Sequence, residues 1–208
     1  MTDVLESFDY KIILLDDFVK WILEYMNDEY YFLGNHSKNV AIISCAILDK
    51  LGINGQDKKL MQYGALLHDI GKLSIPKDIL LAPRRLSDKE FEIIKDHPII
   101  GFNKLSHIKS FVDINLLVLY HHYRNGLGYP EDLIIQNTSK PNMLLVDILT
   151  VADAYSAIQE KRMYNNKEKE VFENISIIKM LKDEKEIKNQ GINQEIVDVL
   201  SSCYKYIR

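Results

Sequence analysis

The spacing of apolar residues constrains the fold of this chain more than any other feature of its sequence. Between sparse prolines, apolar residues recur every three or four positions, which is the period of a helix with one buried face. The pattern predicts helices near 8–31, 37–51, 57–70, 87–95, 98–107, 111–121, 143–160, 168–183 and 193–206. The expected fold class is therefore all-α, a single-domain helical bundle.

Two helix boundaries carry signals of their own. Ser87 precedes the segment DKEFEIIK and Glu90 follows three residues later, a pattern typical of a capping box at a helix start. Gly52 follows the run AILDKL, and a glycine in that place indicates the end of a helix.

Composition excludes several classes of protein. A chain of 208 residues with 47% hydrophobic residues can bury one sizeable core. The net charge is −4 with Lys and Arg scattered, so we expect no nucleic-acid polymer as a partner. The N-terminus does not resemble a signal peptide, and no run approaches the roughly 20 apolar residues of a membrane span. We therefore expect a cytoplasmic location without a membrane partner, with Cys45 and Cys203 as packing residues.

Histidine and aspartate residues stand out because they interrupt apolar helical segments. A single histidine on an apolar face is more often a hydrogen-bonded core residue, and His36 or Asp153 alone fits that interpretation. Together, however, the candidates include five of the six histidines, and burying them all costs free energy unless they share partners. We therefore expect convergence on one site of His36, His68, Asp69, His97, His121, His122 and Asp153.

The residue types indicate a metal centre. Neutral imidazole and carboxylate suit Fe, Mn or Zn ions, and this set exceeds what one tetrahedral ion needs. Two ions that share a bridging carboxylate are the simplest interpretation. Adjacent helical residues point about 100° apart, so each doublet is expected beside a helix end, with Gly71 ending the first helix. At least one of His121 and His122 is expected to be a ligand.

Two further features follow the doublets. Lys72 comes three residues after Asp69 and either extends to solvent, as most lysines do, or holds an anion beside the metal site. The stretch NGLGYP at 125–130 by itself predicts only a turn. Because it follows two candidate ligands, we expect it at the mouth of the site.

The order of these residues resembles the HD-GYP branch of the HD-domain metal-dependent phosphohydrolases. The likeness runs from about His36 to the C-terminus, through HDIGKLSIPKDILLAPRRLSDKEFEIIKDHPIIG and TVADAYSAIQEKRMY. It implies an all-helical HD fold, two or three iron or manganese ions, and hydrolysis of the bacterial second messenger cyclic di-GMP. It also implies a helical segment at 1–35 packed on an HD-GYP-like domain at 36–208.

The resemblance implies a role for each matching residue. One metal would be bound by His36, His68, Asp69 and Asp153, and Asp69 would bridge to a second metal held by His97, His121 and His122. Asp69 and Lys72 would be the catalytic residues. The substrate would be bound by Lys72, Arg162, Gly126, Gly128, Tyr129 and Pro130.

Several positions depart from the family pattern. The segment HHYRNGLGYP is one residue shorter than usual and lacks the glutamate after the paired histidines. Phe32 stands where members with three metals carry a glutamate, so we expect two metals. Ser156 replaces the second aspartate of the DvyDA pattern, Asn165 replaces a basic residue and Asp147 stands at a usual arginine position. These changes predict that cyclic di-GMP binds more weakly than in other members of the family, whereas metal binding is retained.

Three functional hypotheses stay open at this point. In the first, a hydroxide bridging the two ions attacks phosphorus in line, while the ions and Lys72 stabilise the developing charge. In the second, a degenerate member senses nucleotides or binds a protein partner through the altered GYP loop. In the third, a related phosphohydrolase acts on another nucleotide. Hydrolysis is favoured, because binding alone would not need the whole metal set. Regulation of the activity is expected to come from a separate partner or from the ligand.

Overall fold

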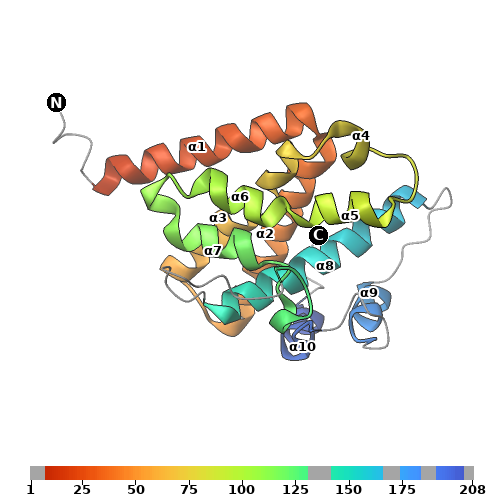
Figure 1. Ribbon diagram of the computed structural model, residues 1–208. Coiled ribbons are helices and arrows are strands. Elements are labelled where there is room, and N and C mark those ends of the chain that lie inside the picture. The colour runs from red at the N-terminus through yellow and green to blue at the C-terminus, as the bar shows by residue number, and fades with distance from the viewer. Residues whose placement is uncertain (1–7, 131–141, 166–173, 184–190, 204–208) are drawn as a thin grey trace.

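The computed structural model describes residues 8–130, 142–165, 174–183 and 191–203, with the backbone alone for 8–14, 161–165 and 174–175. Every regular element in these ranges is a helix, which confirms the all-α prediction (Figure 1). The α-helices are α1 (Phe8–Glu29), α2 (Tyr31–Leu51), α3 (Gln56–Leu67), α4 (Lys77–Leu80), α5 (Asp88–Lys95), α6 (His97–Leu105), α7 (Val112–Tyr120), α8 (Met143–Asn165), α9 (Asn174–Leu181) and α10 (Gln194–Cys203). The 3-10 helices are η2 (Ile70–Ser74), η3 (Lys109–Phe111) and η4 (Arg124–Gly126).

The two boundary signals are confirmed. Ser87 Oγ accepts a hydrogen bond from the Glu90 backbone N–H, and the Glu90 carboxylate accepts one from the Ser87 backbone N–H at 2.8 Å. Gly52 ends α2 in the left-handed conformation, with φ of 72°. Three expected boundaries were wrong: α2 begins six residues earlier, at Tyr31 rather than 37, α3 ends at Leu67 rather than at 70, and α8 continues to Asn165 rather than ending at 160. His36 therefore lies inside a helix rather than at its start. The boundaries expected at 168 and 206 lie outside the described residues.

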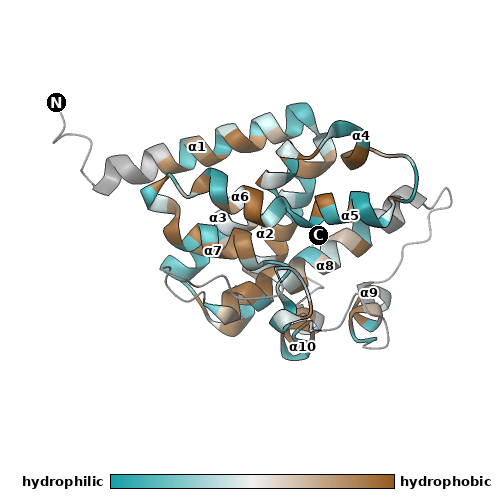
Figure 2. Ribbon diagram, viewed as in Figure 1, coloured by the Kyte–Doolittle hydropathy of each residue, from teal (hydrophilic) through white to brown (hydrophobic). Residues whose placement is uncertain are grey.

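Helix α2 lies at the centre of the molecule and packs against α1, α3, α8 and α10. One hydrophobic cluster fills the space between α2, α3, α7, α8, α9 and α10, with Val40, Ile47, Leu149 and Leu200 fully buried. A second joins α1 to α3, α6 and α7. Helix α7 is buried from Ile114 to Tyr120 and contributes to both clusters. Much of it is coloured as hydrophobic in Figure 2.

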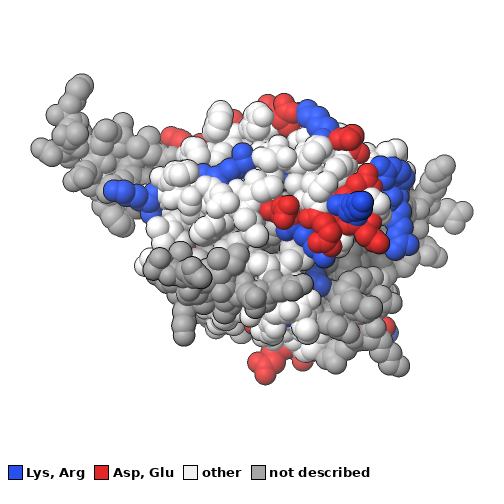
Figure 3. Space-filling model, in the orientation of Figure 1, with Lys and Arg blue, Asp and Glu red and all other residues white. Residues whose placement is uncertain are grey.

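The described surface carries charges of both signs. On the face in Figure 3, Lys and Arg side chains are interspersed with Asp and Glu. Ion pairs on the surface include Arg84–Glu90 and Lys95–Glu92. Within the described ranges, no helix is long and apolar enough to span a bilayer. Cys45 and Cys203 are free thiols.

Candidate metal centre

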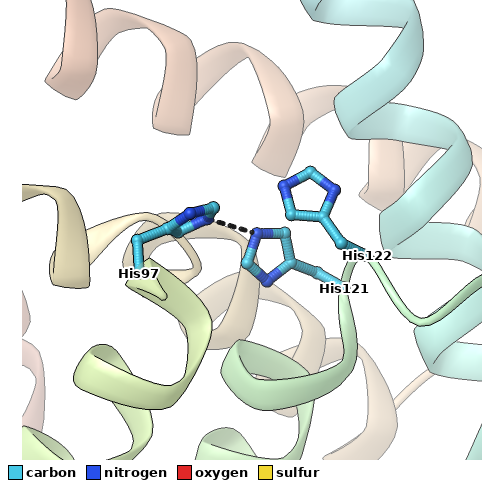
Figure 4. A group of neighbouring side chains, drawn as sticks. All are labelled: His97, His121 and His122. Carbon is cyan, nitrogen blue, oxygen red and sulfur yellow. Dashed lines mark hydrogen bonds between the residues drawn. The ribbon is translucent and has the colours of Figure 1, made fainter. Parts of the chain in front are cut away.

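Five separate elements bring the candidate ligands together. His36 lies on α2, His68 directly follows α3, His97 opens α6, His121 directly follows α7, and Asp153 lies within α8. All five side chains are buried. Figure 4 shows the rings of His97, His121 and His122 turned toward one another from α6 and from the end of α7. The structure thus brings together residues that span most of the chain.

The first group of ligand atoms surrounds Asp153. His36 Nε2 lies 2.9 Å from Asp153 Oδ1, and His68 Nε2 lies 3.8 Å from the same oxygen. The atoms that His36, His68 and Asp153 offer all lie within 4.8 Å of one another. These three residues therefore have the spacing that one metal ion requires.

The second group consists of His97, His121 and His122, whose ring nitrogens also lie within 4.8 Å of one another. The Nε2 atoms of His97 and His121 are 3.1 Å apart. His122 is oriented between the groups, because its Nδ1 lies 3.7 Å from Asp153 Oδ2. This group is large enough for a second ion.

Asp69 lies between the two groups and turns one oxygen toward each. Its Oδ2 lies 3.4 Å from His68 Nε2 and 3.9 Å from His36 Nε2. Its Oδ1 lies 3.2 Å from His97 Nε2 and 3.8 Å from His121 Nε2. A carboxylate in this position can bind one ion through each oxygen.

Helix ends determine which nitrogen of three histidines faces the centre. The last four carbonyls of a helix lack partners within that helix. In three places, the Nδ1–H of a histidine donates to the carbonyl three residues earlier. The pairs are His68 to Ala65 (2.8 Å), His97 to Ile94 (2.7 Å) and His121 to Val118 (2.7 Å). This bond places the proton of the neutral ring on Nδ1 and leaves the Nε2 lone pair free. The three side chains are thus oriented as metal ligands.

The donor set fits a divalent transition-metal ion. His68 Nε2 and Asp69 Oδ1 are buried without a hydrogen-bond partner, and buried polar atoms in that state are rare. With both Nδ1 atoms donating to carbonyls, the facing Nε2 lone pairs of His97 and His121 repel each other unless a proton or cation lies between them. Cations bound at the two ligand groups would satisfy these four atoms, and nitrogen and carboxylate donors suit transition metals.

Charges in the site shift its pKa values strongly. Burial raises the pKa of Asp69, but His68 and Lys72 outweigh it and hold that pKa well below the usual range. Burial lowers the pKa of His36, but hydrogen bonds with Asp153 and Glu160 raise it to about 10. Burial and neighbouring imidazoles lower the pKa of His121, while burial lowers that of His122 to about 3. His121 and His122 are therefore neutral at pH 7, as metal ligands must be.

Lys72 contacts the centre directly. Its Nζ donates to Asp69 Oδ2 at 2.6 Å, and its side chain is largely buried. Burial lowers the pKa of Lys72, but the charges of Asp69 and Asp153 raise it overall. The lysine is consequently a fixed positive charge at the edge of the site, and it does not extend to solvent.

Two glycines allow α6 to approach the centre. A Cβ on Gly71 would lie 1.9 Å from the His97 carbonyl oxygen, and a Cβ on Gly101 would lie 2.8 Å from a Val118 methyl carbon. The expectation that Gly71 ends a helix was wrong, because α3 already ends at Leu67 and Gly71 lies inside η2. Gly71 instead provides the close contact that places His97 beside Asp69.

The GYP loop folds back over His122. The Tyr129 backbone N–H donates to the His122 carbonyl at 2.9 Å, and a Cβ on Gly128 would meet that oxygen at 1.7 Å. Gly126 has φ of +83°, and the Tyr129–Pro130 peptide is cis. The Tyr129 ring packs on the His122 ring, with centroids 4.6 Å apart. Within this loop, Tyr129 is therefore the side chain that contacts a candidate ligand.

A cavity of about 580 Å³ opens over the centre. Its apolar wall is formed by Phe32, Leu33, Ile94 and Ala157. Its polar lining includes Lys72 and five of the candidate ligands, which are His36, Asp69, His97, His122 and Asp153. This volume is in the range of small-molecule sites. Among the GYP residues, Tyr129 lines the cavity. Arg162 belongs to α8, but its side chain lies outside the described residues.

Sequence reasoning missed Glu160, which lines the cavity and contacts His36. A signal was present, because Glu160 follows Asp153 by seven residues and Ser156 by four, a spacing that places all three on one face of a helix. The apolar wall had no comparable signal, since its residues come from distant segments.

Comparisons with known proteins agree with this geometry. The family model described as HD domain matches residues 33–158. A cyclic di-GMP phosphodiesterase from Thermotoga maritima is 36% identical over 159 residues, covering 73% of this chain and 42% of the relative. Cyclic di-GMP phosphodiesterase PdeB from Borreliella burgdorferi is 34% identical over 169 residues, covering 81% and 43%. The chain thus spans less than half the length of these relatives.

A solved structure shares the fold. The HD domain of the L. monocytogenes phosphodiesterase PgpH, in complex with cyclic-di-AMP, superposes with a TM-score of 0.57 at 21% identity, covering 88% of this chain and 92% of that one. That likeness supports the helical architecture. The family match covers more than half of the chain and includes all the candidate ligands, so this chain belongs to the HD domain family.

Proposed function

We propose that this chain is a metal-dependent phosphodiesterase that hydrolyses cyclic di-GMP with two divalent ions, iron or manganese. The observation that carries the proposal is the position of Asp69, with one oxygen toward each of two ligand groups on the floor of a cavity. Relatives that are named cyclic di-GMP phosphodiesterases support the choice of substrate.

In this proposal, one ion would be held by His36, His68 and Asp153, and the other by His97, His121 and His122. Asp69 would offer one oxygen to each ion. Bound divalent cations supply Lewis acidity, which lowers the pKa of water and stabilises charge on a phosphoryl group. The carbonyls of Ala65, Ile94 and Val118 hold His68, His97 and His121 in the tautomer that a metal ligand requires. The ligand set therefore needs little rearrangement to bind metal.

Lys72 acts on the substrate in the proposed reaction. Its ammonium lies on the cavity wall beside Asp69, where it can bind a phosphate oxygen and stabilise charge that develops during hydrolysis. Tyr129 and Phe32 give the cavity an aromatic lining against which a base can pack. Arg162 is proposed as a second phosphate contact.

Binding of cyclic di-GMP is proposed to be weaker than the family signature implies. The GYP loop is shortened, and Tyr123 replaces the expected glutamate. Each lost charge-assisted contact removes about 1–3 kcal/mol of binding free energy. Chemistry on a simple phosphodiester should therefore be less affected than turnover of the dinucleotide.

The test is hydrolysis by protein loaded with Mn²⁺ or, without oxygen, with Fe²⁺. The substrates are cyclic di-GMP, cyclic di-AMP and bis(p-nitrophenyl) phosphate, with products separated by chromatography. We expect cleavage of cyclic di-GMP to a linear product and faster turnover than with cyclic di-AMP. Full metal loading without cleavage of any substrate would contradict the proposal and favour a sensing or protein-binding module.

A further inference from the structure

His36 differs from the other buried histidines in how it is oriented. His68, His97 and His121 each follow the last turn of a helix and donate Nδ1–H to a carbonyl there. His36 lies inside α2, where the carbonyls of the preceding turn belong to the helix hydrogen-bond ladder. Its ring must therefore take its orientation from a side chain.

That side chain is Glu160. Its Oε1 lies 3.3 Å and its Oε2 lies 3.2 Å from His36 Nδ1, although the two residues are 124 positions apart. A carboxylate only accepts hydrogen bonds, so Nδ1 carries a proton and donates it to Glu160. The opposite ring nitrogen, Nε2, is thereby directed at Asp153, 2.9 Å away.

Glu160 is held in place from two helices. Asn39, one turn after His36 on α2, donates to Glu160 Oε1 at 3.2 Å, and Ser156, one turn earlier on α8, donates to the same atom at 3.1 Å. The Ser156 hydroxyl also lies 3.3 Å from His36 Nδ1. The carboxylate is partly buried, with 26% of its side chain exposed, which strengthens its hydrogen bonds relative to those of a surface residue.

We propose that Glu160 is the positioning residue of the first metal site, which orients His36 through Nδ1 and makes Nε2 a stronger ligand. The inference rests on the proposed two-metal function. It gives a role to Glu160, a residue to which the family motifs assign none. Partners of this kind raise the basicity of a metal-bound histidine, and their loss typically lowers metal affinity about 10- to 100-fold. The effect should be confined to the ion held by His36, His68 and Asp153.

The experiment is a titration of the metal-free full chain with Mn²⁺, in which electron paramagnetic resonance measures the free ion. We expect two binding equivalents in the wild type and, in Glu160→Ala, an affinity about 10- to 100-fold lower for one equivalent alone. Glu160→Gln retains an acceptor oxygen without the charge, and neutral hydrogen bonds are about half as strong. Its affinity should therefore lie between those of the wild type and Glu160→Ala.

Glu92→Ala is the matched control, because it also removes a helical glutamate with a cationic partner, Lys95, on the exposed surface of α5. It should leave both equivalents unchanged. A purely structural role for Glu160 would change unfolding without selective loss of one equivalent, and wild-type affinities in Glu160→Ala would overturn the inference. A wild type that binds no Mn²⁺ would instead refute the proposed metal centre, so the two failures are distinguishable.

Discussion

Replacement of Gly71 by alanine tests how the backbone places the second ligand group. The added Cβ would lie 1.9 Å from the His97 carbonyl oxygen and 2.8 Å from the Gly101 amide nitrogen. Non-bonded heavy atoms at optimal separation lie about 3.5 Å apart, so α6 must retreat from η2 by roughly 1.5 Å. Because both colliding atoms belong to the backbone, no side-chain rotation can relieve the contact.

This retreat is large compared with the tolerance of a metal site. Ligand distances must be met within about 0.2 Å, and His97 moves with the helix that it opens. We expect Gly71→Ala to lose most affinity for the ion at His97, His121 and His122 and to retain the other ion. Overpacking of this kind also lowers the free energy of unfolding by about 1–3 kcal/mol.

The assay is a Mn²⁺ titration combined with urea unfolding, and Gly64→Ala is the control. A Cβ on Gly64 would lie 2.5 Å from Leu117 Cδ1 and 3.0 Å from Leu117 Cβ. Rotation of the Leu117 side chain relieves the closer contact, and no backbone atom is among the nearest neighbours. Gly64→Ala should therefore be destabilised and still bind both ions. If Gly71→Ala bound two ions with wild-type affinity, the reasoning about the close contact of η2 and α6 would be refuted.

Two further predictions concern charge in the site. Lys72→Ala should keep both Mn²⁺ ions by elemental analysis but lose roughly 100- to 1,000-fold in kcat, as on removal of a transition-state donor; loss of the ions would show that Lys72 instead maintains the ligand set. The pKa of His36 is raised from 6.5 to about 10 in the metal-free fold, so its proton stabilises that fold fully below pH 6.5 and the contribution is lost as pH rises through 10. From pH 7 to 9 the EDTA-treated protein should lose about 2–3 kcal/mol of unfolding free energy from this group, as measured with urea, whereas a gain would contradict the ion pairing of His36.

Much of the architecture was predictable because helix periodicity is a local property. The all-α class, the capping box at Ser87 and the end of α2 at Gly52 were confirmed. The start of α2 and the end of α3 were not found, since apolar periodicity continues through Tyr31 to Leu33 and beyond Leu67. Those boundaries depend on tertiary contacts, among them the packing of Gly71 against α6.

The convergence of the candidate ligands was predictable because buried imidazoles and carboxylates need partners. The roles of Gly71 and Glu160 were not, because each depends on an approach between distant segments: η2 against α6, and α8 against α2. The backbone carbonyls that accept hydrogen bonds from His68, His97 and His121 were also not predicted. Their signal is local, however, since each of these three histidines lies within two residues after a helix end.

The central claim is that Asp69 joins two metal ions, and the metal content of the wild type and Asp69→Ala tests it most directly. Both proteins are loaded with excess Mn²⁺, freed of unbound ion by gel filtration and analysed for manganese per chain, with circular dichroism to confirm folding. The account predicts two ions in the wild type and fewer than one in Asp69→Ala, because both ligand groups lose a shared carboxylate. Equal manganese content in two folded proteins would contradict it.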